Sequence, residues 1–395
     1  MREGWVTYKI ENILSKIIDN RGKNPPFSEV GYPYVDTTCI VGNNRFPDYS
    51  LIRKYIAEDT YNSWFRSGHP TKNDLLIATV GANIGKICLM DETKICIAQN
   101  TVGLRINPKI ADPIFVYYVL SSNGVQAHLK SLDVGSAQPS IKVPHLLNVN
   151  IDLPNLPSQT CIATVLSTLD DKIELNHQAN QTLEAIAQAI FKEWFVDFRF
   201  PGATGEMQDS EMGQIPKGWR VGKLGDVCEF AYGKGLKSEN RIDGKYPVVG
   251  SNGIVGTHAE YFVDGPGIVI GRKGTIGEVT WIHQNFFPID TTFYIKDLLG
   301  VKGLYFHYFL LKLQDFKKIG SDSAVPGLNR NQAYDNILNI PTKNSIEGFN
   351  NIARAIFENI QNNEQQSATL TAIRDALLPK LMNGEVSVET KEALL

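Results

Sequence analysis

The sequence repeats itself at a fixed distance, and this repeat constrains the fold more than any other feature. Residues 182–190 read TLEAIAQAI and residues 369–377 read TLTAIRDAL, and five of the nine positions are identical. The same offset of 187 residues aligns SAQP (136–139) with SAVP (323–326), and Pro154 with Pro341. A register held over this distance indicates a duplicated chain, in which each half is one structural unit.

Each half ends in a stretch with helical periodicity. In the first half, apolar residues and two asparagines recur at alternating steps of four and three from Ile162 to Trp194. This narrow stripe is typical of a coiled-coil seam. An amphipathic helix that packs only on its own domain is the alternative interpretation. Because the polar positions in the middle of the stripe match between the two copies, we favour pairing of the two helices with each other.

The expected helix ends differ between the copies. Pro154 and Pro157 precede the first helix, and the Pro-Gly pair at 201–202 follows it. In the second copy Arg374 interrupts the stripe, where Ile373 can substitute, and Pro379 is expected to kink or end the helix. The seam residues are predicted to be Ile162, Leu166, Leu169, Ile173, Asn176, Asn180, Leu183 and Ile190 in the first helix, and Ile356, Ile360, Asn363, Leu370 and Leu377 in the second.

The connectivity sets the direction of the helices and so the architecture. The first helix leads from one globular block to the next, so two paired helices must run antiparallel. We predict an α+β fold with two α/β heads, joined by two long antiparallel helices that form a coiled-coil spacer with pseudo-twofold symmetry. A helix of about 33 residues would be roughly 50 Å long. The predicted segments are a first head (1–153), a first helix (154–200), a linker (201–214), a second head (215–341) and a second helix (342–395).

The charge distribution leaves the two heads free to approach phosphate. The chain as a whole carries a net charge of −3, but residues 1–153 hold 16 Lys and Arg against 14 Asp and Glu. Residues 215–341 hold 15 against 12, so the acidity is concentrated in the connecting segments. The sequence has no apolar run of membrane-spanning length, and its five cysteines show no metal-ligand spacing. We therefore expect a soluble cytoplasmic protein.

Three short motifs resemble known sites but lack the context that each site needs. Asn24–Phe27 reads NPPF, the signature with which amino-methyltransferases hold a flipped base, yet no Gly-rich methyl-donor fingerprint accompanies it. GANIGK (81–86) is one residue short of a P-loop. GRKG (271–274) has the form of an RNA-clamping GXXG loop but lies between strand-like runs. No catalytic group and no metal ligand is assigned.

The GRKG turn nevertheless offers Arg272 and Lys273 as donors beside flexible glycines, and a glycine-bearing turn occurs at the matching place in the first copy. We take these turns and their surroundings as candidate DNA-binding segments. The candidate residues are Lys72, Asn83, Lys86, Gln99, Asn100, Ser136 and Gln138 in the first head, and Ser251, Asn252, His258, Arg272, Lys273, Thr275, Asp290, Thr291, Ser323 and Arg330 in the second.

Longer stretches carry a resemblance to a known family. They are STLDDKIELNHQANQTLEAIAQAIFKEWF (167–195), IPKGWRVGKLGDV (215–227), YPVVGSNGIVG (246–256), GRKGTIG (271–277) with DTTFYI (290–295), and ALLPKLMNGEV (376–386). Over essentially its whole length the chain resembles the DNA-specificity subunit of type I restriction-modification enzymes. The first head departs from the pattern, with ATVGANIG in place of the basic GRKGTIG.

The resemblance implies a non-enzymatic recognition subunit whose two heads each read one half of a bipartite double-stranded DNA target. It further implies that the helices space the heads and dock two modification (methyltransferase) subunits, and that restriction subunits with translocase activity join the complex. S-adenosylmethionine, ATP and Mg would then reside on the partners and not on this chain. Two alternatives remain at this point: a free-standing adenine methyltransferase that uses NPPF, and a coiled-coil adaptor that does not bind DNA.

Overall fold

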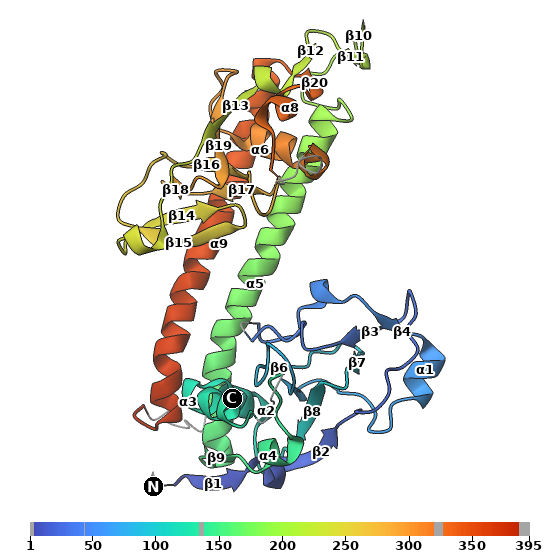
Figure 1. Cartoon of the computed structure of the whole chain (residues 1–395), viewed down its shortest axis with the longest axis vertical. Coiled ribbons are helices and arrows are strands. Elements are labelled where there is room, and N and C mark those ends of the chain that lie inside the picture. Colours follow the sequence, from blue (N-terminus) through green and yellow to red (C-terminus); the bar gives the residue numbers. More distant parts are fainter. Residues whose placement is uncertain (1–3, 43, 134–137, 320–326, 387–395) are drawn as a thin grey trace. The chain divides into compact units, whose positions relative to one another are not determined.

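The computed structural model describes residues 4–42, 44–133, 138–319 and 327–386. The chain forms two compact units, and each contains one head and parts of both long helices (Figure 1). Unit 1 comprises residues 1–175 and 366–395, and unit 2 comprises residues 176–365. The fold class expected from the sequence, two mixed heads with two long helices, is confirmed.

The first head is built on a four-stranded antiparallel sheet in the order β2-β8-β5-β6. A second sheet, β4-β3-β7, joins one antiparallel and one parallel pair, and β1 pairs with β9. The strands are β1 (Val6–Lys9), β2 (Leu14–Ile18), β3 (Tyr32–Val35), β4 (Tyr55–Ile56), β5 (Leu75–Ala78), β6 (Ile87–Leu89), β7 (Cys96–Ile97), β8 (Thr101–Ile106) and β9 (Asn150–Leu153), and the helices are α1 (Glu58–Ser63), α2 (Pro113–Ser121), α3 (Asn123–Ser131) and α4 (Val143–Leu147).

The second head repeats this topology strand for strand. Its main sheet has the order β13-β19-β16-β17, its second sheet the order β15-β14-β18, and β12 pairs with β20. The strands are β12 (Arg220–Lys223), β13 (Cys228–Tyr232), β14 (Tyr246–Gly250), β15 (Gly253–His258), β16 (Gly267–Gly271), β17 (Val279–Ile282), β18 (Phe287–Pro288), β19 (Thr292–Asp297) and β20 (Ile337–Ile340), and the helices are α6 (Tyr305–Lys312), α7 (Phe316–Ile319) and α8 (Arg330–Tyr334).

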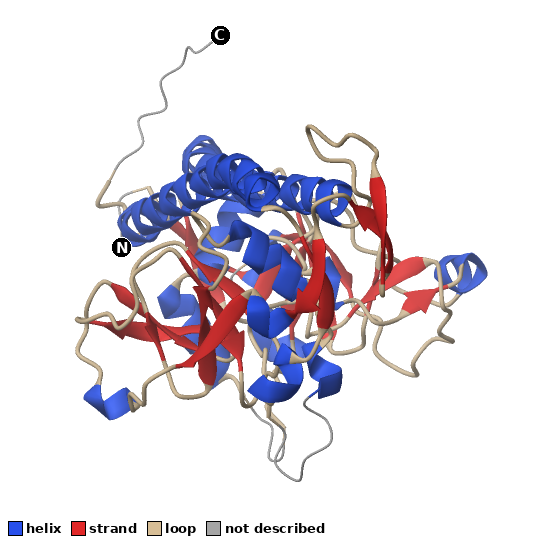
Figure 2. Ribbon diagram, turned by 90° about the horizontal axis from the view of Figure 1, so that it is seen from above, coloured by secondary structure: helices blue, strands red, loops and turns tan. Residues whose placement is uncertain are grey.

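Both heads therefore have the same pattern of strand pairing, including one parallel pair in each second sheet. Figure 2 shows that the strands are short and are joined by irregular loops. One further element, the hairpin of β10 (Met207–Ser210) and β11 (Gly213–Pro216), occupies the segment that we expected to be a plain linker. The shared topology agrees with the duplication expected from the 187-residue register.

The two long helices, α5 (Leu156–Phe195) and α9 (Lys343–Met382), have 40 residues each and exceed the expected length. The first helix begins before Pro157, which is tolerated because the amide hydrogens of a first turn have no intrahelical acceptor. Pro379 lies within the last turn of α9 and does not end it at once, so the expected stop is displaced to Met382. The residues after Pro379 are held in place because Leu381 and Met382 are buried.

Within unit 2, α5 and α9 are joined by asparagines of the expected seam. Asn176 Nδ2 donates to the carbonyl of Asn363 at 3.3 Å, and Asn180 Nδ2 donates to the carbonyl of Ile360 at 3.3 Å. Asn363 Nδ2 in turn donates to Asn180 Oδ1 at 2.8 Å. The contact partner on α9 moves from Asn363 to Ile360 as the residue on α5 moves from Asn176 to Asn180, so the two helices run antiparallel. Complementary amides at a buried seam fix the register of the two helices at some cost in stability.

Within unit 1, a charged pair joins the same two helices. Arg374 Nη1 donates to Asp170 Oδ1 at 2.6 Å, and the side chains of Arg374 and Asp170 are 25% and 9% exposed. Tyr118 of α2 donates to the other oxygen of Asp170, so this carboxylate joins the head to both helices. The interruption at Arg374 is therefore a specific contact. Ile373, which was expected to substitute in the stripe, is 43% exposed, and that expectation is wrong.

The remaining seam positions follow the expected burial. Their side chains are buried or half-buried, and the set is Ile162, Leu166, Leu169 and Ile173 with Leu370 and Leu377 in unit 1, and Leu183 and Ile190 with Ile356 and Ile360 in unit 2. The stripe that the sequence shows is thus the face that each helix turns away from solvent.

The core of each head is completed by helical residues from the other copy of the repeat. In unit 1 the core that holds Phe115 and Leu104 also contains Leu381 and Met382 of α9. In unit 2 an aromatic core forms around Phe349 of α9 and includes Phe191, Trp194 and Phe195 of α5. Each fully buried side chain of this size contributes about 2 kcal/mol. No helix among the described residues is long and apolar enough to cross a membrane.

The Arg374–Asp170 pair gives a test of the helix pairing in unit 1. Arg374→Ala leaves a largely buried carboxylate without its cation, and we expect the free energy of unfolding to fall by about 2–3 kcal/mol. The control is Lys380→Ala, at an exposed position of the same helix. Urea unfolding followed by circular dichroism measures both variants, and equal unfolding midpoints for the two would contradict the role of the pair.

Candidate nucleic-acid interface

In the second head, backbone hydrogen bonds hold the turn after β16 at the end of the main sheet where β13 and β16 end and β19 begins. Arg272 N donates to the carbonyl of Thr291 at 2.9 Å, and Leu328 N donates to the carbonyl of Arg272 at 2.9 Å. Gly274 has a φ of +79°, a left-handed conformation that glycine adopts without strain. The turn thus presents the side chains of Arg272 and Lys273 from a fixed backbone.

The guanidinium of Arg272 is oriented by three contacts. Its Nη2 donates to the carbonyl of Asp290 at 2.8 Å. Its central carbon lies 5.2 Å from the centroid of the Tyr232 ring and 5.8 Å from that of Phe293. Cation–π contacts of this kind hold a planar guanidinium with one edge toward solvent. Arg272 is therefore largely pre-oriented for a ligand.

Arg330 reaches the same tyrosine from helix α8. Asn329 caps this helix, since its side-chain oxygen accepts from the amides of Asn331 (3.0 Å) and Gln332 (3.3 Å). The guanidinium carbon of Arg330 lies 5.0 Å from the Tyr232 centroid, and its Nη1 donates weakly to the carbonyl of Phe230 at 3.4 Å.

Tyr334 ties α8 to strand β13. Its hydroxyl oxygen accepts from the amide of Phe230 at 2.7 Å, so the short helix that carries Arg330 is anchored to the main sheet. Burial raises the pKa of Tyr334, and the phenol stays neutral at ordinary pH. Arg330, like Arg272, thus extends from a backbone segment that hydrogen bonds fix to the main sheet.

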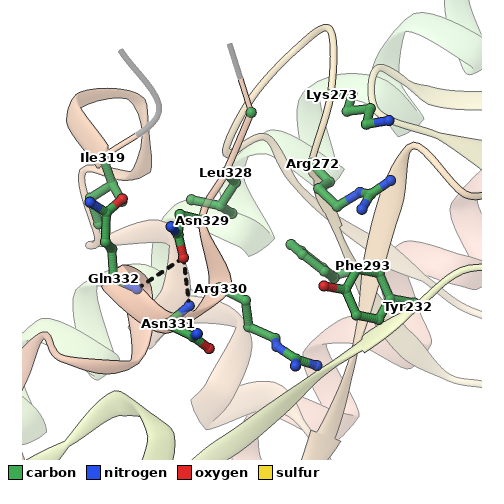
Figure 3. Close-up of a pocket in the computed structure, with 11 residues that line it drawn as sticks. Tyr232, Arg272, Lys273, Phe293, Ile319, Leu328, Asn329, Arg330, Asn331 and Gln332 are labelled. Carbon is green, nitrogen blue, oxygen red and sulfur yellow. Dashed lines mark hydrogen bonds between the residues drawn. The ribbon is translucent and has the colours of Figure 1, made fainter. Parts of the chain in front are cut away.

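The side chains of Tyr232, Arg272 and Arg330 line a pocket of about 410 Å³ in the second head. Figure 3 shows the side chains of Arg272 and Arg330 extending toward Tyr232 from two different segments. Lys273 lines the same pocket and is exposed. The amide side chains of Asn331 and Gln332 lie on its α8 side.

The electrostatics of the pocket favour an acceptor-rich ligand. Within the part of the chain that the structure describes, Arg272, Lys273 and Arg330 form no ion pair with a carboxylate. The Nε atoms of Arg272 and Arg330 are buried without a hydrogen-bond partner among those residues. Guanidinium groups that have no carboxylate partner and are held in fixed directions recognise phosphate oxygens and guanine edges.

The structure brings together most of the candidates predicted in the second head. A side chain at Gly274 would meet Ser251 Oγ, so the β14–β15 hairpin tip, with Ser251 and Asn252, lies beside the turn. Thr275 belongs to that turn. Asp290 and Thr291 contribute the carbonyls that hold Arg272. Of the predicted candidates, Arg272, Lys273 and Arg330 line the pocket itself, and the others lie on the adjoining turns.

His258 does not join this group. It is 7% exposed, and its Nδ1 accepts from the amide of Ile242 at 3.0 Å. The histidine therefore joins the end of β15 to the loop at Ile242, and the prediction that it contacts DNA is corrected. The prediction is wrong because His258 is buried, and the sequence alone does not show which residues are buried at the end of this hairpin.

The first head has the same scaffold at this place but different side chains. Thr79 N donates to the carbonyl of Asn100, and Ile141 N donates to the carbonyl of Thr79, so Thr79 occupies the place of Arg272. Val80 and Val143 correspond to Lys273 and Arg330, because Val143 is likewise the first residue of its short helix.

The tyrosine is replaced as well. Extending the β2–β8 register by one residue places Asp19 opposite Val102, as Tyr232 lies opposite Phe293. Asp19 pairs with Arg21 at 2.6 Å. The first head therefore lacks the Arg–Tyr–Arg arrangement among its described residues.

The predicted candidates of the first head are only partly brought together. Gln138 is exposed and lies beside Gly81, near Asn100 at the end of β5. Gln99 precedes Asn100 and is half-buried. Ser136, like Ser323 of the second head, lies outside the described residues. The side-chain amides of Gln99, Asn100 and Gln138 therefore stay candidate DNA contacts of the first head.

The other three first-head candidates have structural contacts. Lys72 lies before β5, at the opposite end of this strand, and pairs with Glu92 at 2.7 Å. Asn83 Nδ2 donates to the carbonyl of Thr37 at 2.7 Å, and the aliphatic chain of Lys86 packs at Gly42. Lys72 therefore lies away from the candidate residues at the other end of β5. The side chains of Asn83 and Lys86 already contact other parts of the first head.

The NPPF segment is an irregular stretch in the first head. Asn24 is exposed, and Phe27 makes an edge contact with Tyr34 at 5.2 Å and lies under Lys54 Nζ at 4.5 Å. Among the described residues, no group of three or more His, Cys, Asp and Glu side chains could hold a metal ion.

Comparison with known proteins assigns the chain to a family. A family model described as the type I restriction modification DNA specificity domain matches residues 2–185 and 216–371. The chain belongs to this specificity family. The two matched segments correspond to the two copies of the repeat, each with most of a long helix, so the family match and the internal duplication agree.

Curated relatives of the specificity family extend over most of the chain. The MjaIX type I restriction enzyme specificity subunit of Methanocaldococcus jannaschii is 29% identical over 299 residues, covering 70% of this chain and 69% of the relative. The HindI specificity subunit of Haemophilus influenzae is 24% identical over 405 residues, covering 80% and 87%. The crystal structure of a type I S subunit from M. genitalium shares the fold, with a TM-score of 0.61 at 20% identity, covering 95% of this chain and 96% of that one.

Sequence reasoning missed the residue that joins the two arginines. Tyr232 is 51% exposed at the end of β13, and its ring contacts both guanidinium groups. An exposed aromatic at the end of a strand, next to the Gly-Lys-Gly segment 233–235, is a signal that could have marked it. The contact with Arg330 could not be read from the sequence, since the two residues are 98 positions apart.

The shared tyrosine predicts a measurable effect on DNA binding. Tyr232→Leu removes two cation–π contacts, each worth about 0.5–1 kcal/mol, so we expect affinity for the cognate DNA to fall roughly 5- to 30-fold. Tyr261→Leu, at an exposed tyrosine of the same head, serves as the control. Fluorescence anisotropy of the assembled complex gives the affinities. Equal affinity for the wild type and Tyr232→Leu would show that the tyrosine does not organise the site.

Proposed function

We propose that this chain recognises a bipartite double-stranded DNA target, with each head reading one half, and that it catalyses no reaction itself. The observation that carries the proposal is the repetition of one scaffold in two heads, with two pre-oriented arginines at the strand ends of the second head's main sheet. Family membership and the named specificity subunits among the relatives support it. Paired heads that carry separate reading surfaces suit two half-sites separated by an unread spacer.

In this proposal the catalytic and energy-converting parts lie on partner proteins. Two modification subunits would hold S-adenosylmethionine and flip the target base, and restriction subunits would use ATP and Mg for translocation. The chain would act inside the cell, where its DNA target is. The duplicated long helices support two equivalent docking sites, because a partner that fits one copy of the repeat fits the other.

Exposed apolar residues on the long helices support two such docking sites. Val165 and its repeat equivalent Ile352 are 37% and 39% exposed, and Ile186 and its equivalent Ile373 are 45% and 43% exposed. Each unit thus exposes one pair, Val165 with Ile373 in unit 1 and Ile352 with Ile186 in unit 2. Apolar side chains that stay exposed at matching positions of both copies favour two copies of the same partner.

Aspartate substitutions test this arrangement. Ile186→Asp combined with Ile352→Asp places charges in one docking site, and we expect native mass spectrometry to find one modification subunit bound where the wild type binds two. Val165→Asp with Ile373→Asp should remove the other subunit. Ile254→Asp, at an exposed isoleucine of the second head, is the control. Two bound subunits in both double variants would refute the sites.

The competing methyltransferase hypothesis makes an opposite prediction for the isolated chain. We expect the purified chain with DNA and labelled S-adenosylmethionine to transfer no methyl group, because Asn24–Phe27 is an irregular segment whose phenylalanine packs against Tyr34. Addition of the modification subunits should start transfer, and Asn24→Ala should leave it unchanged. Transfer by the chain alone that is lost in Asn24→Ala would establish the methyltransferase instead.

A further inference from the structure

The chemistry of the second-head pocket differs between its three cations. Arg272 and Arg330 are half-buried, and each is fixed by an aromatic ring and a backbone carbonyl. Lys273 is exposed on the glycine-flanked turn, and no hydrogen bond or ion pair to a described residue fixes its ammonium. A mobile point charge suits the DNA backbone, whose phosphates carry no sequence information. A rigid planar fork suits an acceptor pair of fixed spacing.

We propose that Arg272 and Arg330 read guanine in the half-site of the second head, each fork holding one guanine, while Lys273 contacts a backbone phosphate. Guanine is the base that offers two acceptors, O6 and N7, on one major-groove edge, and bidentate arginine is its commonest partner. Because both Nε atoms are buried, the contact is made end-on, through the terminal nitrogens. This inference rests on the proposed function, and it names the base that the pocket of the second head recognises.

The braced geometry supports base reading over backbone binding. Arg272 extends from a backbone that is hydrogen-bonded to Thr291 and Leu328 on its two sides, and α8, which carries Arg330, is tied to β13 through Tyr334. Such bracing restricts the directions in which the forks point, which a phosphate contact does not need and base discrimination does. The first head has Thr79 and Val143 at the equivalent places, so its half-site must be read by other side chains.

The experiment uses the chain assembled with its modification subunits. The target is first identified from the methylated motif, and the half-site of the second head is the one that changes when residues 215–341 are exchanged. We expect this half-site to specify at least one G·C pair. Arg272→Lys or Arg330→Lys keeps the charge but loses the fork, so discrimination at that pair should fall roughly 5- to 150-fold. Replacing the guanine by 7-deazaguanine in the DNA should weaken the wild type by a similar factor.

Lys273→Ala is the matched comparison. It should weaken binding to all sequences alike and lower the slope of log affinity against log salt by about one. A second half-site without a specified guanine would overturn the inference. So would arginine variants that weaken all sequences alike, or tolerance of 7-deazaguanine by the wild type, because these results indicate phosphate contacts. Failure of the proposed function would look different: the wild-type complex would then methylate without sequence preference.

Discussion

The structure depends on the packing of each head against the long helix that belongs to the other copy of the repeat. The core of the first head closes over Leu381 and Met382 of α9, and that of the second over Phe191 and Trp194 of α5. The hydrophobic core of each head therefore needs residues from both copies of the repeat. Specific polar contacts fix the register of the two helices, the asparagines in unit 2 and the Asp170–Arg374 pair in unit 1. A slip of the helices within either unit would expose the core of that unit, so the pairing is tightly specified.

On this common scaffold the two candidate DNA-binding sites have diverged in chemistry. The hydrogen bonds that position Arg272 in the second head position Thr79 in the first. The second head gathers guanidinium groups around Tyr232, whereas the first offers amides near Gly81. A duplicated framework with different side chains at one edge is well suited to recognising two unlike half-sites, because the edge can change without loss of the core.

Much of the fold follows from the sequence, because periodicity and repetition are local or register-based signals. The seam from Ile162 to Ile190 and the strand-like runs around residues 74–106 and 267–295 are of this kind. The sheet order, the burial of His258 and the ion pair of Arg374 depend on contacts between distant residues, and no spacing reveals them. For the site, the basic turn at Arg272 was identifiable, but its shared ring at Tyr232 arises only in the folded head.

The central proposal is that one chain carries two heads that read DNA, and that its paired helices determine the length of the unread spacer between the two half-sites. Insertion of one heptad into both α5 and α9, at matched positions of the seam, lengthens each helix by about 10 Å, or roughly three base pairs of DNA. Sequencing of methylated motifs from cells that express the altered chain with its modification subunits measures the result directly. The account predicts the same two half-sites with a spacer about three base pairs longer. Unchanged half-sites with an unchanged spacer would contradict it.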